Sequence, residues 1–116
     1  LRVETLGKTI TQGTAITSNG MKQVSGDAVI LQDHQIPSTM QEVRSYILVA
    51  DKTTNEDLPF IREARALVIE DPDPESHAVT CAKLLETPII YGATNATKLV
   101  HNGQMLNLNL GEGTVN

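Results

Sequence analysis

The chain has 116 residues, of which 40% are hydrophobic and only 3% aromatic, and its formal net charge is −5. This length suits a single domain with a modest, mainly aliphatic core. Because the chain is acidic and has no basic cluster, neither nucleic acid nor an anionic membrane surface is an expected partner. No apolar run approaches the roughly 20 residues of a membrane span, and no signal peptide is recognisable.

Cys81 is the single cysteine, which excludes an intrachain disulfide and favours a reducing cytoplasm. The sequence begins at Leu1 rather than at methionine, and residues 111–116 resemble a turn that enters one more short strand. We therefore expect residues 1–116 to form one domain of a longer polypeptide.

The first part of the chain is predicted to be largely extended. Residues 1–16 are rich in β-branched side chains, Asn19-Gly20 predicts a tight turn, and residues 27–31 predict a strand. Residues 38–41 fit a capping box, with serine at the N-cap and glutamine three residues later. This pattern predicts a short helix that ends near Arg44.

Buried strands alternate with helices in the middle of the chain. Residues 46–50 and residues 66–69 are continuous apolar runs, which are typical of strands covered on both faces. Between them, residues 53–57 offer several capping side chains for a helix over 58–64, and Pro59 fits the first turn of that helix. This order favours parallel strand pairing.

The same alternation continues to the C-terminus. A helix is predicted over about 75–86, a strand over 88–91, and a short helix from Thr94 or Asn95 to Val100. Residues 104–110 alternate leucine with asparagine, which predicts a strand with one buried face and one wet face. The predicted fold class is therefore α/β, with a parallel-strand βαβ core and additional short strands.

The stretch from Val68 to Glu86 carries the candidate site. It runs from the end of a strand, through an acidic turn, into a helix whose first turn contains His77. The start of a helix attracts anions because its backbone N–H groups and its dipole point outward. A histidine placed there could accept a phosphoryl group. Four acidic residues of the same turn oppose a dianion: Glu70, Asp71, Asp73 and Glu75.

The order of these segments resembles the phosphohistidine, or swivelling, domain of phosphoenolpyruvate-utilising enzymes, which include pyruvate phosphate dikinase and phosphoenolpyruvate synthase. The version it resembles most is the extra C-terminal domain of pyruvate kinases from many Gram-positive bacteria. The similarity rests on the Ser-His-Ala helix start at residues 76–78 and on segments that match in order and spacing: Gly7-Lys8, 26–30, 95–99 and Gly103-Gln104. It implies a swivelling β/β/α fold at the C-terminal end of a larger cytoplasmic enzyme.

Active members of that family carry the motif Gly-Gly-x-Thr-Ser-His-Ala, whose histidine accepts the phosphoryl group. The resemblance makes His77 the candidate phosphoryl acceptor and gives phosphate-binding positions to Ser76 and Glu75. This chain departs from the motif in the preceding residues, because prolines and acids occupy positions 72–75.

The departure argues against phosphate binding. Pro72 and Pro74 fix the backbone and remove two amide donors, and the carboxylate of Glu75 can only accept hydrogen bonds. Two like charges about 4 Å apart repel by on the order of 4 kcal/mol at an effective dielectric constant near 20. The sequence therefore favours a retained, non-phosphorylated His77 over a phosphoryl carrier.

The acidic turn also makes sense as a helix start. We expect Asp73 at the N-cap, Pro74 at the first helical position and Glu75 in the first turn. A buried helix face is predicted from the spacing of Ala78, Cys81, Ala82 and Leu85. On that face the thiol of Cys81 is expected to pack as a small hydrophobic group rather than to act as a nucleophile.

The remaining polar residues indicate no further chemistry. His34 and His101 lie in polar connections and are expected to be solvated. The pair Thr53-Thr54 is expected to cap a helix rather than to take part in catalysis. The acidic residues have no metal-ligand spacing, so no metal site is predicted.

Three functional hypotheses follow. The first is an accessory, non-phosphorylated domain of a pyruvate kinase, whose partners are the catalytic body and neighbouring subunits of the parent enzyme. The second is a working phosphohistidine carrier with His77 as acceptor, and the third is a free-standing sensor of a small ligand. The resemblance implies no cofactor in this domain, whereas a parent pyruvate kinase would use phosphoenolpyruvate, ADP, Mg²⁺ and K⁺ outside this chain.

Overall fold

The computed structural model describes residues 9–17 and 20–116. The strands in this part of the chain form one sheet in the order β1-β8-β7-β3-β4-β5-β6-β2. Their bounds are β1 Thr11–Gln12, β2 Thr14–Ile16, β3 Gln23–Ile30, β4 Ile47–Ala50, β5 Ala66–Ile69, β6 Ile89–Tyr91, β7 Met105–Asn109 and β8 Thr114–Val115.

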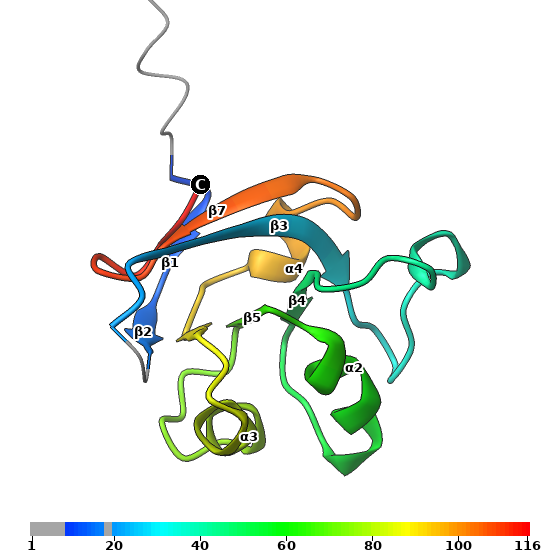
Figure 1. The fold of residues 1–116 in the computed structure, drawn as a ribbon, viewed down its shortest axis with the longest axis horizontal. Coiled ribbons are helices and arrows are strands. Elements are labelled where there is room, and N and C mark those ends of the chain that lie inside the picture. Colours follow the sequence, from blue (N-terminus) through cyan, green and yellow to red (C-terminus); the bar gives the residue numbers. More distant parts are fainter. Residues whose placement is uncertain (1–8, 18–19) are drawn as a thin grey trace, which may run out of the picture.

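Four of these strands form the parallel centre of the sheet. β3, β4, β5 and β6 pair in parallel, whereas β7 pairs with β3 in the antiparallel sense. The helical segments are η1 Ser38–Met40, η2 Asn55–Asp57, α2 Leu58–Glu63, α3 His77–Leu85 and α4 Ala96–Leu99. Figure 1 shows α2 and α3 beneath the central strands and α4 on the opposite face, under the arch of β3 and β7. The predicted α/β fold with a βαβ core is confirmed.

The central strands are buried because both faces of the sheet are covered. Every residue of β4 and β5 is buried, as their continuous apolar sequences predict. Leu48 and Leu67 contribute to the hydrophobic core that includes residues of α2 and α3. Ile47 and Val68 contribute to the second core, which includes residues of α4, β7 and β8. The sheet is therefore the shared wall of two aliphatic cores.

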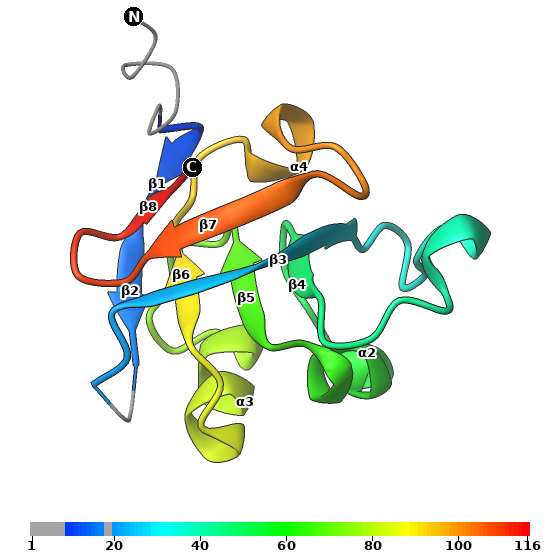
Figure 2. The same cartoon turned by 45° about the horizontal axis from the view of Figure 1, so that its top comes forward.

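The sheet nearly closes on itself through its first two strands. β1 pairs with β8 at one end of the strand order, and β2 pairs with β6 at the other end. Only Gly13 separates β1 from β2, so consecutive residues link the two ends (Figure 2). The amide of Gly13 donates to the carbonyl of Gly113 over 2.8 Å, which fixes the seam.

Several predicted boundaries are wrong. β3 begins at Gln23 rather than at residue 27, because its first half pairs with β7 and its second half pairs with β4. The predicted helix after Pro37 is only the 3-10 turn η1, and Ser38 makes no capping hydrogen bond. Asn95 precedes α4 with a left-handed φ of 59° and also makes no side-chain cap. Polar residues alone were therefore poor indicators of these helix starts.

The C-terminal prediction is confirmed in more detail. Leu106, Leu108 and Leu110 are buried, and Asn107 between them is exposed. The segment after Leu110 turns into β8, as expected. Residues 1–8 and the turn residue Asn19 lie outside the described residues, so the predictions there are not tested.

Candidate functional site at the start of α3

His77 is the first residue of α3, which follows the carboxyl end of β5. Ser76 is the N-cap, and its Oγ accepts a hydrogen bond from the amide of Val79 over 3.3 Å. The Ser76 carbonyl accepts from the amide of Thr80 over 3.0 Å, which begins the helical ladder. The prediction that Asp73 is the N-cap is therefore wrong, and the helix starts after the acidic turn rather than within it.

The acidic residues of the turn hold the turn itself together. Asp71 Oδ1 accepts from the amide of Asp73 over 3.0 Å, and Asp73 Oδ1 accepts from the amide of Glu75 over 2.8 Å. The Asp73 carbonyl then accepts from the amide of Ser76 over 3.1 Å. Short side chains that bond to backbone groups two residues later are a common way to build a turn.

This bonding leaves the turn without spare donors. Pro72 and Pro74 have no amide hydrogen, and each other amide of residues 72–76 already donates within the turn. Phosphate sites in loops depend on several backbone N–H groups that converge on the anion. The segment that leads to His77 is thus satisfied internally and offers an anion no backbone donor.

Glu70 has a separate structural role. Its Oε2 accepts from the amide of Thr97 over 2.7 Å and from the hydroxyl of Thr97 over 2.6 Å. A carboxylate at the start of a helix satisfies an otherwise free amide and interacts favourably with the helix dipole. The sequence predicted that Thr94 or Asn95 would cap this helix, but Asn95 makes no side-chain cap and Glu70 supplies the acceptor at the start of α4.

The ring of His77 is held at both nitrogens by the segment that follows β4. Thr53 Oγ1 lies 2.8 Å from Nδ1, and Asn55 Oδ1 lies 2.9 Å from Nε2. Thr53 is 5% exposed, whereas Asn55 is exposed. Nδ1 therefore points to the protein interior and Nε2 to the solvent side. Within the described part of the chain, none of the hydrogen bonds to this ring comes from a carboxylate.

Cys81 lies one helical turn after His77 and contacts the same ring. Its Sγ is 3.5 Å from Nε2 and 3.9 Å from Nδ1. Burial raises the pKa of the Cys81 thiol, so the sulfur stays protonated at neutral pH. The expectation of a buried, unreactive cysteine is consistent with this environment, but its contact with His77 was not predicted.

The predicted inner face of α3 is correct apart from its last residue. Ala78, Cys81 and Ala82 are buried, and so is Val79, which was not predicted. Leu85 is 42% exposed because the helix ends there and Glu86 turns into a left-handed conformation. The helix thus packs on the sheet through its first two turns, which are the turns that position His77.

Thr53 and Asn55 are the site residues that sequence reasoning missed. The pair Thr53-Thr54 was expected to cap a helix. Thr54 does so, because its Oγ1 accepts from the amide of Glu56 over 3.3 Å, whereas Thr53 bonds to His77. A usable signal was present, because residues directly after neighbouring parallel strands meet at the same edge of the sheet. The segment after β4 should therefore have been expected to reach His77, which follows β5.

The other two histidines have different environments. His101 is exposed, as expected. His34 is also exposed at the surface, but it is not simply solvated, because its Nδ1 lies 3.1 Å from the buried carboxylate of Asp57. This hydrogen bond and then the charge of Glu56 raise the pKa of His34 above its ordinary value. Over residues 9–17 and 20–116, no group of three potential ligands is placed to hold a metal ion.

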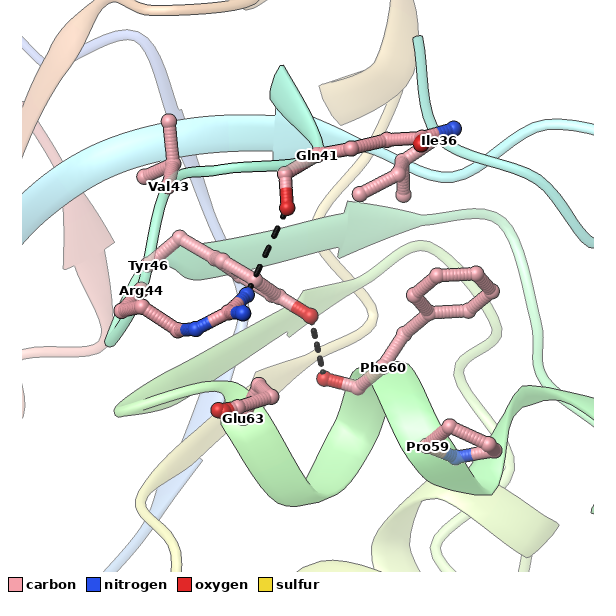
Figure 3. Close-up of a pocket in the computed structure, with 8 residues that line it drawn as sticks. All are labelled: Ile36, Gln41, Val43, Arg44, Tyr46, Pro59, Phe60 and Glu63. Atoms are coloured by element: carbon pink, nitrogen blue, oxygen red, sulfur yellow. Dashed lines mark hydrogen bonds between the residues drawn. The ribbon is translucent and has the colours of Figure 1, made fainter. Parts of the chain in front are cut away.

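A separate cavity of about 260 Å³ lies beside α2 (Figure 3). Its walls include Phe60 and Tyr46, whose hydroxyl donates to the carbonyl of Phe60 over 2.8 Å. None of the residues that contact the His77 ring lines this cavity.

The helices of the described chain are all too short or too polar to cross a membrane.

Similarity to known proteins agrees with this arrangement. The chain is 30% identical over 115 residues to a pyruvate kinase of Geobacillus stearothermophilus. The matched segment covers 99% of this chain and 19% of that protein. It is 31% identical over 110 residues to a phosphoenolpyruvate synthase of Aquifex aeolicus, with 95% of this chain and 12% of that protein covered. The chain thus spans about a fifth or less of the length of these relatives.

The fold also matches a solved structure. An NMR solution structure of Enzyme I superimposes with a TM-score of 0.56 at 21% sequence identity, over 71% of this chain and 34% of that chain. At this identity the match concerns the fold alone, and it supports the swivelling β/β/α architecture. The family of PEP-utilising enzyme mobile domains matches residues 43–113, a segment that contains β4 to β7, Thr53, Asn55 and His77. The chain therefore belongs to the mobile-domain family of phosphoenolpyruvate-utilising enzymes.

Proposed function

We propose that this chain is an accessory domain of a pyruvate kinase and that its His77 is not phosphorylated. The observation that carries the proposal is the turn over residues 72–76, whose two prolines lack amide hydrogens and whose other amides all donate within the turn. A phosphoryl dianion beside His77 would find no backbone donor in this turn and would meet its acidic side chains. The similarity to pyruvate kinases over 99% of the chain supports the choice of parent enzyme.

In this role the domain packs against the catalytic body of the parent enzyme or against a neighbouring subunit, in the cytoplasm. It needs no cofactor of its own, and Mg²⁺, K⁺, phosphoenolpyruvate and ADP bind elsewhere in the parent enzyme. The domain stabilises the oligomer or adjusts its response to effectors.

Deletion tests the accessory role. Removing residues 1–116 from the parent enzyme should leave most of the phosphoryl transfer from phosphoenolpyruvate to ADP, measured as steady-state turnover. The subunit number of the truncated enzyme, measured by analytical ultracentrifugation, shows in the same experiment whether it remains assembled. Complete loss of turnover in a folded, assembled truncated enzyme would contradict the accessory role.

The second candidate is a phosphohistidine carrier, and the contact between Thr53 and Nδ1 of His77 favours it. The Thr53 hydroxyl fixes Nδ1, so the nitrogen that a phosphoryl donor would have to reach is Nε2, whose partner Asn55 is an exposed side chain. Phosphoenolpyruvate synthases are among the relatives that match nearly the whole chain. This candidate predicts an acid-labile phosphate on the intact parent enzyme after incubation with labelled phosphoenolpyruvate or ATP.

The labelling experiment separates the two candidates. We expect no label on this domain, and the His77→Ala variant should behave like the wild-type enzyme. Label that appears on the wild-type domain and disappears in His77→Ala would establish the carrier and overturn the accessory proposal.

A further inference from the structure

The cavity beside α2 has an apolar end and a charged end (Figure 3). Its apolar end includes Ile36, which is buried, and the half-buried ring of Phe60. Figure 3 shows Arg44 and Glu63 on the other side of the Tyr46 hydroxyl. The cavity therefore offers a single ligand one cation, one anion and a hydrophobic wall.

The two charged side chains of the cavity are not paired with each other. In the part of the chain that the structure describes, the ion pairs all involve His34. The Arg44 guanidinium donates to the carbonyl of Gln41 over a long 3.4 Å. Burial is the main cause of the raised pKa of Tyr46, but the charge of Glu63 adds to the rise and the charge of Arg44 opposes it. Both charges therefore act near the same hydroxyl.

The Tyr46 hydroxyl can only accept a hydrogen bond from a ligand. Its proton is donated to the carbonyl of Phe60 over 2.8 Å, so the lone pairs of its oxygen remain. An ammonium group at this point would donate to the Tyr46 oxygen and to the Glu63 carboxylate. A carboxylate next to that ammonium would pair with Arg44, because a guanidinium offers several donors to carboxylate oxygens.

Charge and size restrict the class of ligand. The lining has one positive and one negative side chain, which sum to zero, so a phosphorylated ligand would meet Glu63 with its own negative charges. Pockets for drug-sized ligands have volumes of about 300–1,000 Å³. The cavity measures about 260 Å³, so it suits a smaller molecule.

We propose that this cavity binds a free α-amino acid with an aliphatic side chain. Its carboxylate pairs with Arg44, its ammonium group lies between Glu63 and the Tyr46 oxygen, and its side chain packs against Phe60. None of the residues that contact the His77 ring lines the cavity, so the inference goes beyond the proposed function and does not depend on it.

L-Leucine is the probe, and NMR titration of the 116-residue chain is the measurement. Phe60 is the single phenylalanine of the chain, so isotope-labelled phenylalanine gives ring signals from the cavity alone. Of the two tyrosines, Tyr46 lines the cavity and Tyr91 does not, which makes Tyr91 the internal reference. L-Leucine should shift the signals of Phe60 and Tyr46 saturably and leave those of Tyr91 in place. Absence of a saturable shift would overturn the proposal.

Three analogues of leucine test its three contacts separately. Isocaproate lacks the ammonium group, isoamylamine lacks the carboxylate, and L-alanine lacks most of the apolar side chain. Loss of either charge should weaken binding by about two- to fivefold, the range for exposed ion pairs. L-Alanine should give no saturable shift. Equal affinities for leucine, isocaproate and isoamylamine would overturn the proposal, because the cavity would then bind any apolar molecule.

Substitutions test which side chain meets which charge of the ligand. Arg44→Met should weaken the binding of L-leucine by about two- to fivefold and leave that of isoamylamine unchanged, since isoamylamine has no carboxylate. Glu63→Gln should weaken L-leucine in the same way and leave isocaproate no weaker. Arg62→Met and Glu42→Gln are the matched controls, because both residues are exposed and lie outside the lining. An equal loss for all ligands in Arg44→Met or Glu63→Gln would overturn the assigned contacts.

The intact parent enzyme distinguishes a ligand site from a protein interface. Equilibrium dialysis with labelled L-leucine should show binding to the parent enzyme that Arg44→Met weakens. Binding to the 116-residue chain but not to the parent enzyme would overturn the proposal, because a neighbouring protein surface would then cover the cavity. These measurements do not involve His77, so the deletion and labelling experiments still test the accessory function on their own.

Discussion

The contact between His34 and Asp57 shows how a single ionisable residue supports the candidate site. Asp57 is buried and closes the capping box that carries Asn55, and His34 bonds its carboxylate from the surface. The charges of Glu56 and Asp33 also favour the protonated form of His34. The stability of the segment next to His77 therefore depends on the protonation of His34.

The raised pKa of His34 makes this contribution depend on pH in a defined direction. Because the folded state holds the proton more tightly, the stabilisation is complete below the ordinary pKa of 6.5 and is lost as pH rises through the higher pKa of the folded state. The variant His34→Asn removes the titrating ring and tolerates the left-handed φ of 64° at this position. The difference in urea midpoint between wild type and variant should be larger at about pH 5.5 than at about pH 8.5. An equal difference at both pH values would contradict the assignment.

At the scale of secondary structure, helix starts in this chain are set by side chains that only the fold identifies. Ser76 caps α3 and Glu70 satisfies the start of α4 from the end of another strand. Ser38 looks like a cap in the sequence but makes no capping hydrogen bond. The two serines therefore form a natural pair for comparison.

Replacing the true cap should be costly and replacing the apparent one should not. Ser76→Ala removes the acceptor of the Val79 amide and should lower the free energy of unfolding by about 1 kcal/mol. Ser38→Ala is the control and should change it by less than about 0.5 kcal/mol. Urea denaturation of both variants measures the difference, and a larger effect at Ser38 would show that the helix starts are wrongly assigned.

Tyr46 links a strand to a helix. Its side chain is 2% exposed, and its hydroxyl donates to the Phe60 carbonyl, which ties the start of β4 to α2 beside the cavity of Figure 3. Burial and then the charge of Glu63 raise the pKa of Tyr46 to about 12. The phenol therefore stays protonated in the folded state at pH values where the unfolded chain has begun to ionise.

Two measurements follow for Tyr46. Tyr46→Phe leaves the Phe60 carbonyl without its donor and should lower the free energy of unfolding by about 1 kcal/mol at neutral pH. Since the folded pKa lies above the unfolded value, the wild-type chain should also lose stability as pH rises from about 10 toward about 12, and Tyr46→Phe should lose less. Parallel alkaline unfolding curves for the two proteins would refute this origin of the pH dependence.

At the scale of the whole molecule, the seam between the two ends of the sheet depends on close backbone contact. A Cβ atom on Gly13 would collide with the carbonyl oxygen of Tyr91, so only glycine fits there. Gly113 lies across the seam, with a φ of 74° and its carbonyl bonded by the Gly13 amide. A Cβ atom on Gly113 would collide with the carbonyl oxygen of Gly13, so both positions across the seam are closed to a side chain.

Gly13→Ala should therefore destabilise the closed sheet. The clash is with backbone, which has little freedom to move, and overpacking of this kind costs about 1–3 kcal/mol or more. Gly111→Ala is the matched control, because its Cβ would meet only an ordinary 3.4 Å contact with the Asn109 side chain. Thermal unfolding should show a large drop in midpoint for Gly13→Ala alone. Similar midpoints for the two variants would mean that the seam is looser than described.

The sequence by itself determined the central strands, the order of strands and helices, and the position of His77 at a helix start. These features are local, because apolar runs over 46–50 and 66–69 and the alternation of leucine with asparagine reflect burial that neighbouring residues share. The aliphatic composition likewise predicted the kind of core. The predicted positions of the helix ends were less accurate, because several side chains near each end compete for the same few backbone amides.

Only the tertiary structure decided which side chains meet at His77. Thr53 and Asn55 lie 24 and 22 positions away in the sequence, and they reach the ring because β4 and β5 are parallel neighbours with the same carboxyl edge. The closure of the sheet between β1 and β8 is a contact of the same kind. Such contacts depend on the relative placement of whole strands, which no local pattern of residues contains.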